Sequence, residues 1–221
     1  MATDGQRWDL VIFDNDGVVV DSEPLASLAM HETLAGLGHR MTVDEIDDQL
    51  KGGTLGRTRG VLEQRFGPLP PDFEDNYTAK LYELMTDQLR PVPGIEAVLD
   101  GLDAAGVPYC IASSGRRERV RFALETASVS RRFGDRYWGA EDAPRGKPAP
   151  DLFLAAASGM HVAPERCVVV EDSELGVRAA HAARMTVFGF AARTPADRLS
   201  SADAVFKDMA DLPALLLGPA R

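Results

Sequence analysis

The sequence contains little of what several protein classes depend on. Only two of its 221 residues are cysteine, and both Cys110 and Cys167 fall in apparent strands, which indicates buried structural thiols and a reducing cytosol. The four histidines show no metal-ligand spacing. No apolar run approaches the roughly 18 residues of a membrane span, and the N-terminus lacks the shape of a signal peptide. We therefore expect a cytoplasmic protein with no membrane partner.

Positive charge is also scarce. Lysine and arginine number 24 against 34 aspartates and glutamates, so the net charge is −10, which argues against a nucleic-acid partner. The basic run "GRRERVR" at 115–121 is the one local exception, and we interpret it as a solvated helix face. Hydrophobic residues make up 45% of the chain, which is typical of a globular protein with a substantial core.

Strand-like and helix-like segments alternate from residue 94 to the end. Apolar residues at 95, 98, 99 and 102 recur at helical spacing, and Gly106 follows where a helix C-cap would stand. The later segments predict strands at 107–113, 137–140, 167–171 and 185–190, with helices at 116–127, 151–159 and 173–183. This alternation predicts an α/β fold, a doubly wound parallel sheet with helices on both faces.

Residues 22–90 break that rhythm because they are almost entirely helical in pattern. "TVDE" at 42–45 is typical of a capping box, and "RPVPG" at 90–94 ends the last helix of this segment. We therefore expect a catalytic core of residues 1–21 and 91–221, interrupted by a helical cap domain of residues 22–90. The two short connections between them would serve as hinges.

An unusual acid pair follows the first predicted strand. "LVIF" at 10–13 reads as a buried strand and runs directly into Asp14 and Asp16. Burying like charges is costly unless a cation or a chemical task compensates for it. Because ligands of open α/β sheets bind at the carboxyl ends of the strands, the other strand ends matter most. These ends, with the loop "RGKPAPD", carry Ser113, Ser114, Lys147, Glu171 and Asp172.

This set of groups is suited to phosphate chemistry. Carboxylates without histidine or thiol favour a hard ion, and Mg²⁺ takes a few carboxylates together with waters and phosphate oxygens. The ion and the lysine would neutralise a phosphate that the acids alone would repel, while hydroxyls and N–H groups at a helix start would bind its oxygens. The sequence therefore predicts a phosphoryl-transfer site with Mg²⁺ as the cofactor.

Four motifs in order resemble those of the haloacid dehalogenase superfamily. They are "DNDGVVVDSE", "ASS", "GKPAPD" and "VVVEDSELG", and the likeness spans residues 9 to about 190. The helical insert after the first motif is similar to that of the β-phosphoglucomutase-like branch. The resemblance implies a Rossmann-like core and phosphate-ester chemistry, because relatives that cleave C–halogen or C–P bonds generally lack an acid at the position of Asp16.

The resemblance also implies a role for each motif residue. Asp14 would be the nucleophile that forms an aspartyl-phosphate, and Asp16 would be the general acid and base. Gly17 would allow a tight turn between them and the insert. The metal residues would be Asp14, the backbone carbonyl of Asp16, Asp172 and, through water, Glu171. The phosphoryl oxygens would be bound by Ser113, Ser114 and Lys147.

The resemblance favours a phosphatase of a small phosphorylated metabolite, such as a sugar, polyol or sugar-acid phosphate. Within the cap, Lys51 and Gly52 are the specificity candidates, against the alternative of a glycine-rich turn with an exposed lysine. The mutases of this branch carry an arginine where this chain has Leu55, although Arg57 lies nearby, and a histidine where it has Ala26. Both departures weaken the alternative of a β-phosphoglucomutase-type mutase.

Two further alternatives stay open. Phosphoglycolate is a possible substrate of a phosphatase with this helical insert. A receiver-type signalling domain also gathers aspartates, a hydroxyl and a lysine around Mg²⁺, but it has no large insert after its first strand. We expect the chain to act as a monomer.

Overall fold

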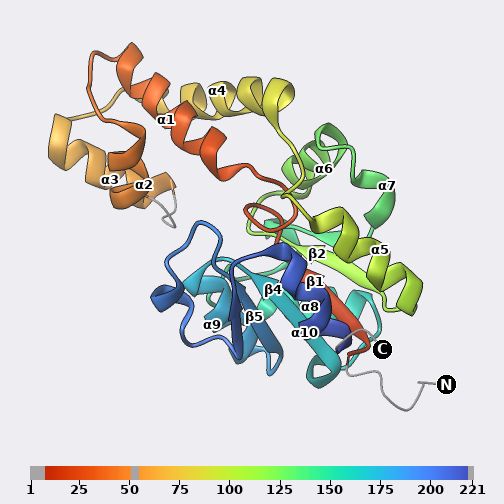
Figure 1. Ribbon diagram of the computed structural model, residues 1–221. Coiled ribbons are helices and arrows are strands. Elements are labelled where there is room, and N and C mark those ends of the chain that lie inside the picture. The colour runs from red at the N-terminus through yellow and green to blue at the C-terminus, as the bar shows by residue number, and fades with distance from the viewer. Residues whose placement is uncertain (1–7, 51–54, 219–221) are drawn as a thin grey trace. The chain divides into compact units, whose positions relative to one another are not determined.

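The computed structural model describes residues 8–50 and 55–218, and the chain divides into two compact units (Figure 1). One unit consists of Met1–Val20 and Arg90–Arg221, and the other of Asp21–Leu89. We call the first the sheet unit and the second the helical unit.

The sheet unit is built on six parallel strands in the order β3-β2-β1-β4-β5-β6. The strands are β1 (Leu10–Phe13), β2 (Tyr109–Ala112), β3 (Tyr137–Trp138), β4 (Cys167–Glu171), β5 (Thr186–Phe190) and β6 (Ala204–Phe206). The helices are α5 (Ile95–Ala105), α6 (Arg117–Thr126), α7 (Ser130–Phe133), α8 (Asp151–Gly159), α9 (Glu174–Ala182) and α10 (Leu212–Leu217). This arrangement confirms the predicted α/β fold with a doubly wound parallel sheet.

The two faces of the sheet are covered by different helices. Side chains of α8 and α9 share one apolar core with alternate residues of β1, β2 and β4, including Ile12, Phe153 and Val177. On the other face, the Tyr109 ring packs edge-on against Phe13 and against Phe133 of α7. Because β1, β2 and β4 are covered on both faces, every residue in them is buried, which explains their continuous apolar sequence.

The helical unit consists of α1 (Glu23–Gly36), α2 (Val43–Leu50), α3 (Leu55–Phe66) and α4 (Phe73–Gln88), with its own core around Leu34, Leu62 and Phe73. The predicted capping box is confirmed. Thr42 N–H donates to the Glu45 carboxylate at 2.8 Å, and Glu45 N–H donates to Thr42 Oγ1 at 3.2 Å. In neither unit is a described helix long and apolar enough to cross a membrane.

Candidate active site

Strand β1 delivers Asp14 to the carboxyl edge of the sheet. All four residues of the strand are fully buried, and the strand pairs with β2 on one side and β4 on the other. The pairing continues one residue further, where the N–H of Asp14 donates to the carbonyl of Val170 at 2.9 Å. The backbone of Asp14 is therefore fixed by the sheet, while its side chain lies beyond the last strand residue.

A tight loop follows Asp14 and fixes the backbone around Asp16. The carbonyl of Asn15 accepts hydrogen bonds from the N–H groups of Val19 and Val20, at 2.9 and 3.0 Å, and Gly17 N–H donates to the carbonyl of Val20. Gly17 has a φ of 80°, a conformation that residues with a side chain adopt at a cost. The expected tight turn at Gly17 is thereby confirmed.

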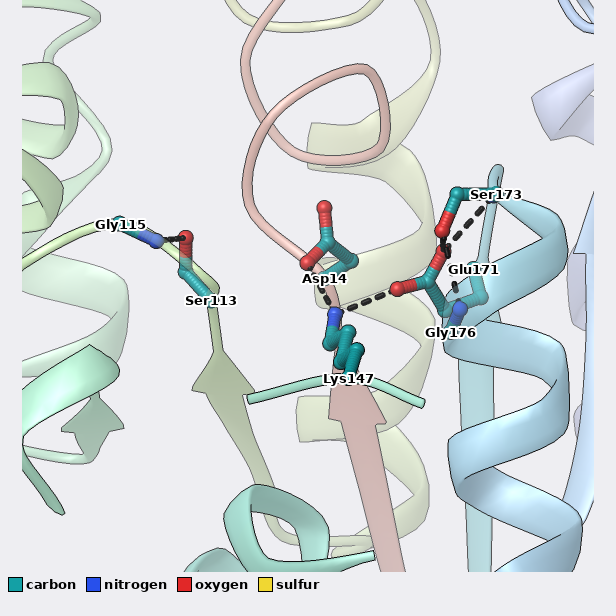
Figure 2. Close-up of polar contacts among 7 residues, drawn as sticks. All are labelled: Asp14, Ser113, Gly115, Lys147, Glu171, Ser173 and Gly176. Atoms are coloured by element: carbon teal, nitrogen blue, oxygen red, sulfur yellow. Dashed lines mark hydrogen bonds and ion pairs between the residues drawn. The ribbon is translucent and has the colours of Figure 1, made fainter. Parts of the chain in front are cut away.

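Lys147 joins the first motif to the last (Figure 2). Its Nζ donates to Asp14 Oδ1 at 2.6 Å and makes a second, very short contact with Glu171 Oε1. The lysine side chain is only 5% exposed, and its ammonium group also lies 4.8 Å from the centre of the Phe153 ring. A buried ammonium group thus bridges two buried carboxylates that are far apart in the sequence.

Helix α9 holds Glu171 in place by its first turn. The second carboxylate oxygen of Glu171 accepts from the N–H of Ser173 at 2.8 Å and from its hydroxyl at 2.9 Å. The same hydroxyl accepts the N–H of Gly176 at 3.0 Å, so Ser173 is also the N-cap of α9. A Cβ on Gly176 would lie 1.9 Å from the Glu171 carboxylate, so this helix position has room only for glycine. Ser173 and Gly176 together therefore fix the position of the Glu171 carboxylate.

The pKa values of Asp14 and Lys147 are both raised above their ordinary values. Burial raises the pKa of Asp14 to about 7, against the opposing effect of Lys147. Burial alone would lower the pKa of Lys147, but the carboxylates of Asp14 and Glu171 outweigh it and raise that pKa above its ordinary value. The lysine is therefore charged, and the Asp14 carboxylate would be stabilised by further positive charge nearby.

The remaining predicted residues of the sheet unit lie at the ends of the neighbouring strands. Ser113 follows β2 and is buried, and its hydroxyl accepts the N–H of Gly115 at 3.0 Å, whereas Ser114 is exposed. Asp172 follows β4 directly and is buried. Asp16 accepts a hydrogen bond from Arg119 Nη2 at 2.9 Å.

The donor set fits a hard divalent cation. Lys147 occupies Oδ1 of Asp14, and Figure 2 shows the other oxygen of this carboxylate pointing away from the lysine. Asp14, Glu171 and Asp172 carry three formal negative charges. Lys147 compensates one of them, and Arg119 pairs with the fourth acid, Asp16, so a divalent ion would balance the remaining two. Within residues 8–50 and 55–218, no three His, Cys, Asp or Glu side chains form a metal-binding group by themselves. The expected ligands are two carboxylates and a backbone carbonyl, which does not require a third acidic side chain.

Three contributing residues had not been singled out in the sequence. Ser173 carried an N-cap signal, and Gly176 was unusual as a glycine within a predicted helix. Arg119 carried no signal of its own because it lies within the basic run, where the expected solvated face holds for Arg116 and Arg121, both exposed. Lys51 and Gly52, the specificity candidates, lie outside the described residues.

Comparisons with known proteins identify the family of the chain. Residues 8–184 match the family model described as a hydrolase, haloacid dehalogenase-like hydrolase. The chain is 29% identical to 6-phosphogluconate phosphatase of Escherichia coli K12 over 84% of each chain, and 28% identical to hexitol phosphatase A of the same organism over 90% of each. A crystal structure of a HAD family hydrolase from Deinococcus radiodurans R1, with bound phosphate and sodium, is 33% identical with a TM-score of 0.84. That match covers 97% of this chain and 100% of the other.

Proposed function

The chain belongs to the haloacid dehalogenase-like hydrolases, and we propose that it is a Mg²⁺-dependent phosphatase acting through an aspartyl-phosphate on Asp14. It is a phosphoric monoester hydrolase, and its substrate is a small phosphorylated metabolite. The observation that carries the proposal is the buried contact between Asp14 and Lys147, with Glu171 behind the lysine. A carboxylate fixed at a strand end beside one charged lysine has the position and the partner that a nucleophile for phosphorus needs.

The first half of the reaction transfers the phosphoryl group to the protein. The carboxylate oxygen of Asp14 attacks phosphorus, and the bond between phosphorus and the ester oxygen breaks. Asp16 gives its proton to that oxygen, so the alcohol leaves uncharged. Lys147 and the Ser113 hydroxyl bind phosphoryl oxygens and stabilise their negative charge during transfer.

The second half returns the protein to its starting state. Asp16, now a carboxylate, takes a proton from a water molecule as that water attacks the phosphorus of the aspartyl-phosphate. The acyl phosphate bond breaks, inorganic phosphate leaves, and the carboxylate of Asp14 is restored. Mg²⁺, held by Asp14, the carbonyl of Asp16 and Asp172, with Glu171 contributing through water, would supply the positive charge that lets an anionic phosphate approach these acids.

The relatives support the substrate class. The names of the two bacterial relatives specify a sugar-acid phosphate and hexitol phosphates, and both are small phosphate esters of polyhydroxylated carbon chains. We therefore propose a sugar, polyol or sugar-acid phosphate as the substrate. The absence of the mutase arginine and histidine, at Leu55 and Ala26, supports transfer of the phosphoryl group to water.

The test is phosphate release from a panel of sugar, polyol and sugar-acid phosphates and phosphoglycolate. The panel is run with Mg²⁺ and with a chelator, and Asp14→Asn serves as the blank. We expect Mg²⁺-dependent multiple turnover by the wild-type protein, and release at the level of the blank by Asp14→Asn with an unchanged circular dichroism spectrum. Substantial activity in Asp14→Asn would overturn the assignment of the nucleophile.

Two other outcomes would replace the proposal. If no phosphate is released but a hexose 1-phosphate becomes its 6-phosphate once the bisphosphate is added, the protein is a mutase. A stable aspartyl-phosphate that does not turn over would indicate a signalling role.

A further inference from the structure

Arg119 connects two catalytic motifs that lie far apart in the chain. It stands in the first turn of α6, and its Nη2 donates to Oδ1 of Asp16 at 2.9 Å, across 103 positions of sequence. The two side chains are 33% and 27% exposed, so the pair lies at the rim of the sheet unit and not in its core. An ion pair this exposed contributes little to stability, so its loss should not unfold the protein.

The course of the arginine side chain brings it past the predicted phosphate-binding turn. A Cβ on Gly115 would lie 3.7 Å from Cδ of Arg119 and 3.3 Å from Oγ of Ser113. The arginine stem and the Ser113 hydroxyl, which is expected to bind a phosphoryl oxygen, therefore both lie close to Gly115. From this position its guanidinium group reaches the carboxylate of Asp16.

The backbone around Asp16 leaves only the side-chain torsions free. The neighbouring carbonyl of Asn15 accepts two hydrogen bonds, and Gly17 donates one within the same loop. A general acid must come within hydrogen-bond reach of the oxygen that it protonates, so the rotamer of Asp16 decides whether it can act. Arg119 donates a hydrogen bond to that carboxylate and can therefore bias its rotamer.

We propose that Arg119 is a positioning residue that keeps the carboxyl group of Asp16 turned toward the leaving oxygen of the substrate. The inference deepens the proposed phosphatase function and depends on it. Arg119 acts through Asp16 and takes no proton itself. Its contribution should therefore be confined to the steps in which Asp16 acts, and it should be largest where the leaving oxygen needs a proton.

The choice of substrate separates this role from a structural one. An alkyl phosphate releases an alkoxide unless an acid protonates it, whereas p-nitrophenyl phosphate releases a stable anion that needs little help. General acid catalysis is worth roughly 10²- to 10⁴-fold on a leaving group that needs a proton. A misplaced Asp16 therefore slows the alkyl ester selectively, while a damaged fold or phosphate site slows both esters.

The experiment measures kcat and KM for Arg119→Gln on p-nitrophenyl phosphate and on the alkyl phosphate of the panel that the wild-type protein hydrolyses fastest. We expect kcat on the alkyl ester to fall by about tenfold or more, with less than about a twofold change on the aryl ester and in either KM. Arg119→Lys should recover part of the loss because it restores a donor. Arg121→Gln, an exposed arginine on the same helix, is the matched control and should leave both esters unchanged.

A double variant shows whether Arg119 acts through Asp16. In an Asp16→Asn background, Arg119→Gln should cause no further loss on the alkyl ester, because two residues that act as a unit are not additive. Equal losses on both esters, no loss on either, or full additivity would each overturn the inference. If the wild-type protein turns over the panel and Asp14→Asn does not, such a result leaves the phosphatase standing. If the wild-type protein hydrolyses nothing, the phosphatase itself fails.

Discussion

Gly176→Ala should damage the site without touching any group that contacts a substrate. The new Cβ would lie 1.9 Å from Cδ and from Oε1 of Glu171. To reach ordinary van der Waals distance, the carboxylate must retreat by roughly 1.5 Å, since a packed interior offers little slack. That shift exceeds what its hydrogen bonds to Ser173 and Lys147 can follow.

The expected cost follows from those contacts. Hydrogen bonds to a charged group contribute about 1.5–3 kcal/mol each, so losing two of them costs about 3–6 kcal/mol. Alanine is favoured over glycine inside a helix by about 1 kcal/mol, which offsets part of the loss. We therefore expect Gly176→Ala to lower the free energy of unfolding by about 2–5 kcal/mol in urea titrations. Because Lys147 loses one of its two carboxylate partners, kcat should fall as well.

Gly101→Ala is the matched control, because it makes the same chemical change within α5 of the same unit. Its Cβ would meet Leu217 Cδ1 at 3.8 Å, an ordinary contact. That variant should be unchanged or stabilised by up to about 1 kcal/mol and fully active. If Gly176→Ala matched Gly101→Ala in both stability and turnover, Glu171 would not be held in the way described.

Three further results are expected. Ser173→Ala removes both an N-cap and a hydroxyl donor to Glu171, so unfolding free energy in urea should fall by about 1–3 kcal/mol, with a lower kcat. Ser113→Ala should weaken competitive inhibition by inorganic phosphate by about tenfold, because one hydrogen bond to a charged oxygen is worth at least about 1.4 kcal/mol. Burial raises the pKa of Cys167 to about 12, and that of Cys110 still higher, so iodoacetamide at pH 8 should label neither thiol in the native protein and both in urea.

Each of these predictions would be contradicted by a specific result. Unchanged stability in Ser173→Ala would show that water replaces its hydroxyl at no cost, and unchanged inhibition in Ser113→Ala would remove that residue from the phosphate site.

The raised thiol pKa values also imply a pH effect with a definite sign. The folded state holds these protons more tightly than the unfolded state, so this stabilisation is complete below about pH 8.5 and is lost as the pH rises toward the folded-state values. Rapid native labelling would contradict the burial of both thiols.

The sequence pattern was sufficient for the elements whose residues are fully buried. Strand β4 was predicted with its actual bounds, because a short apolar run that ends in acids is typical of a central strand in an α/β chain. Strand β6 was not predicted, since its three residues range from buried to exposed and carry no continuous apolar signal. A continuous apolar run in the sequence indicates a fully buried strand. A short edge strand carries no such run, because it depends on pairing with the neighbouring strand.

The same division applies to the site. Asp14, Lys147 and Glu171 could be grouped in advance because parallel strands end at one edge, and the structure brings these three side chains together. What Glu171 binds could not be foreseen, since its contacts to Ser173 and Lys147 depend on the first turn of α9 and on a missing side chain at Gly176. The partner of Arg119 likewise could not be foreseen, because Asp16 lies 103 positions away in the sequence.

The central position of β1 in the sheet affects how the chain folds during synthesis, because its partner strands are made later. Strand β1 leaves the ribosome before the strands with which it pairs, which follow it by about 100 and 150 residues, and the lysine partner of Asp14 lies 133 positions later. At typical rates of translation, on the order of ten seconds or more pass before β4 can complete the pairing. During that time the nascent chain exposes an incompletely paired apolar strand, and Lys147 lacks its contact with Glu171, so we expect a product truncated before Glu171 to be prone to aggregation.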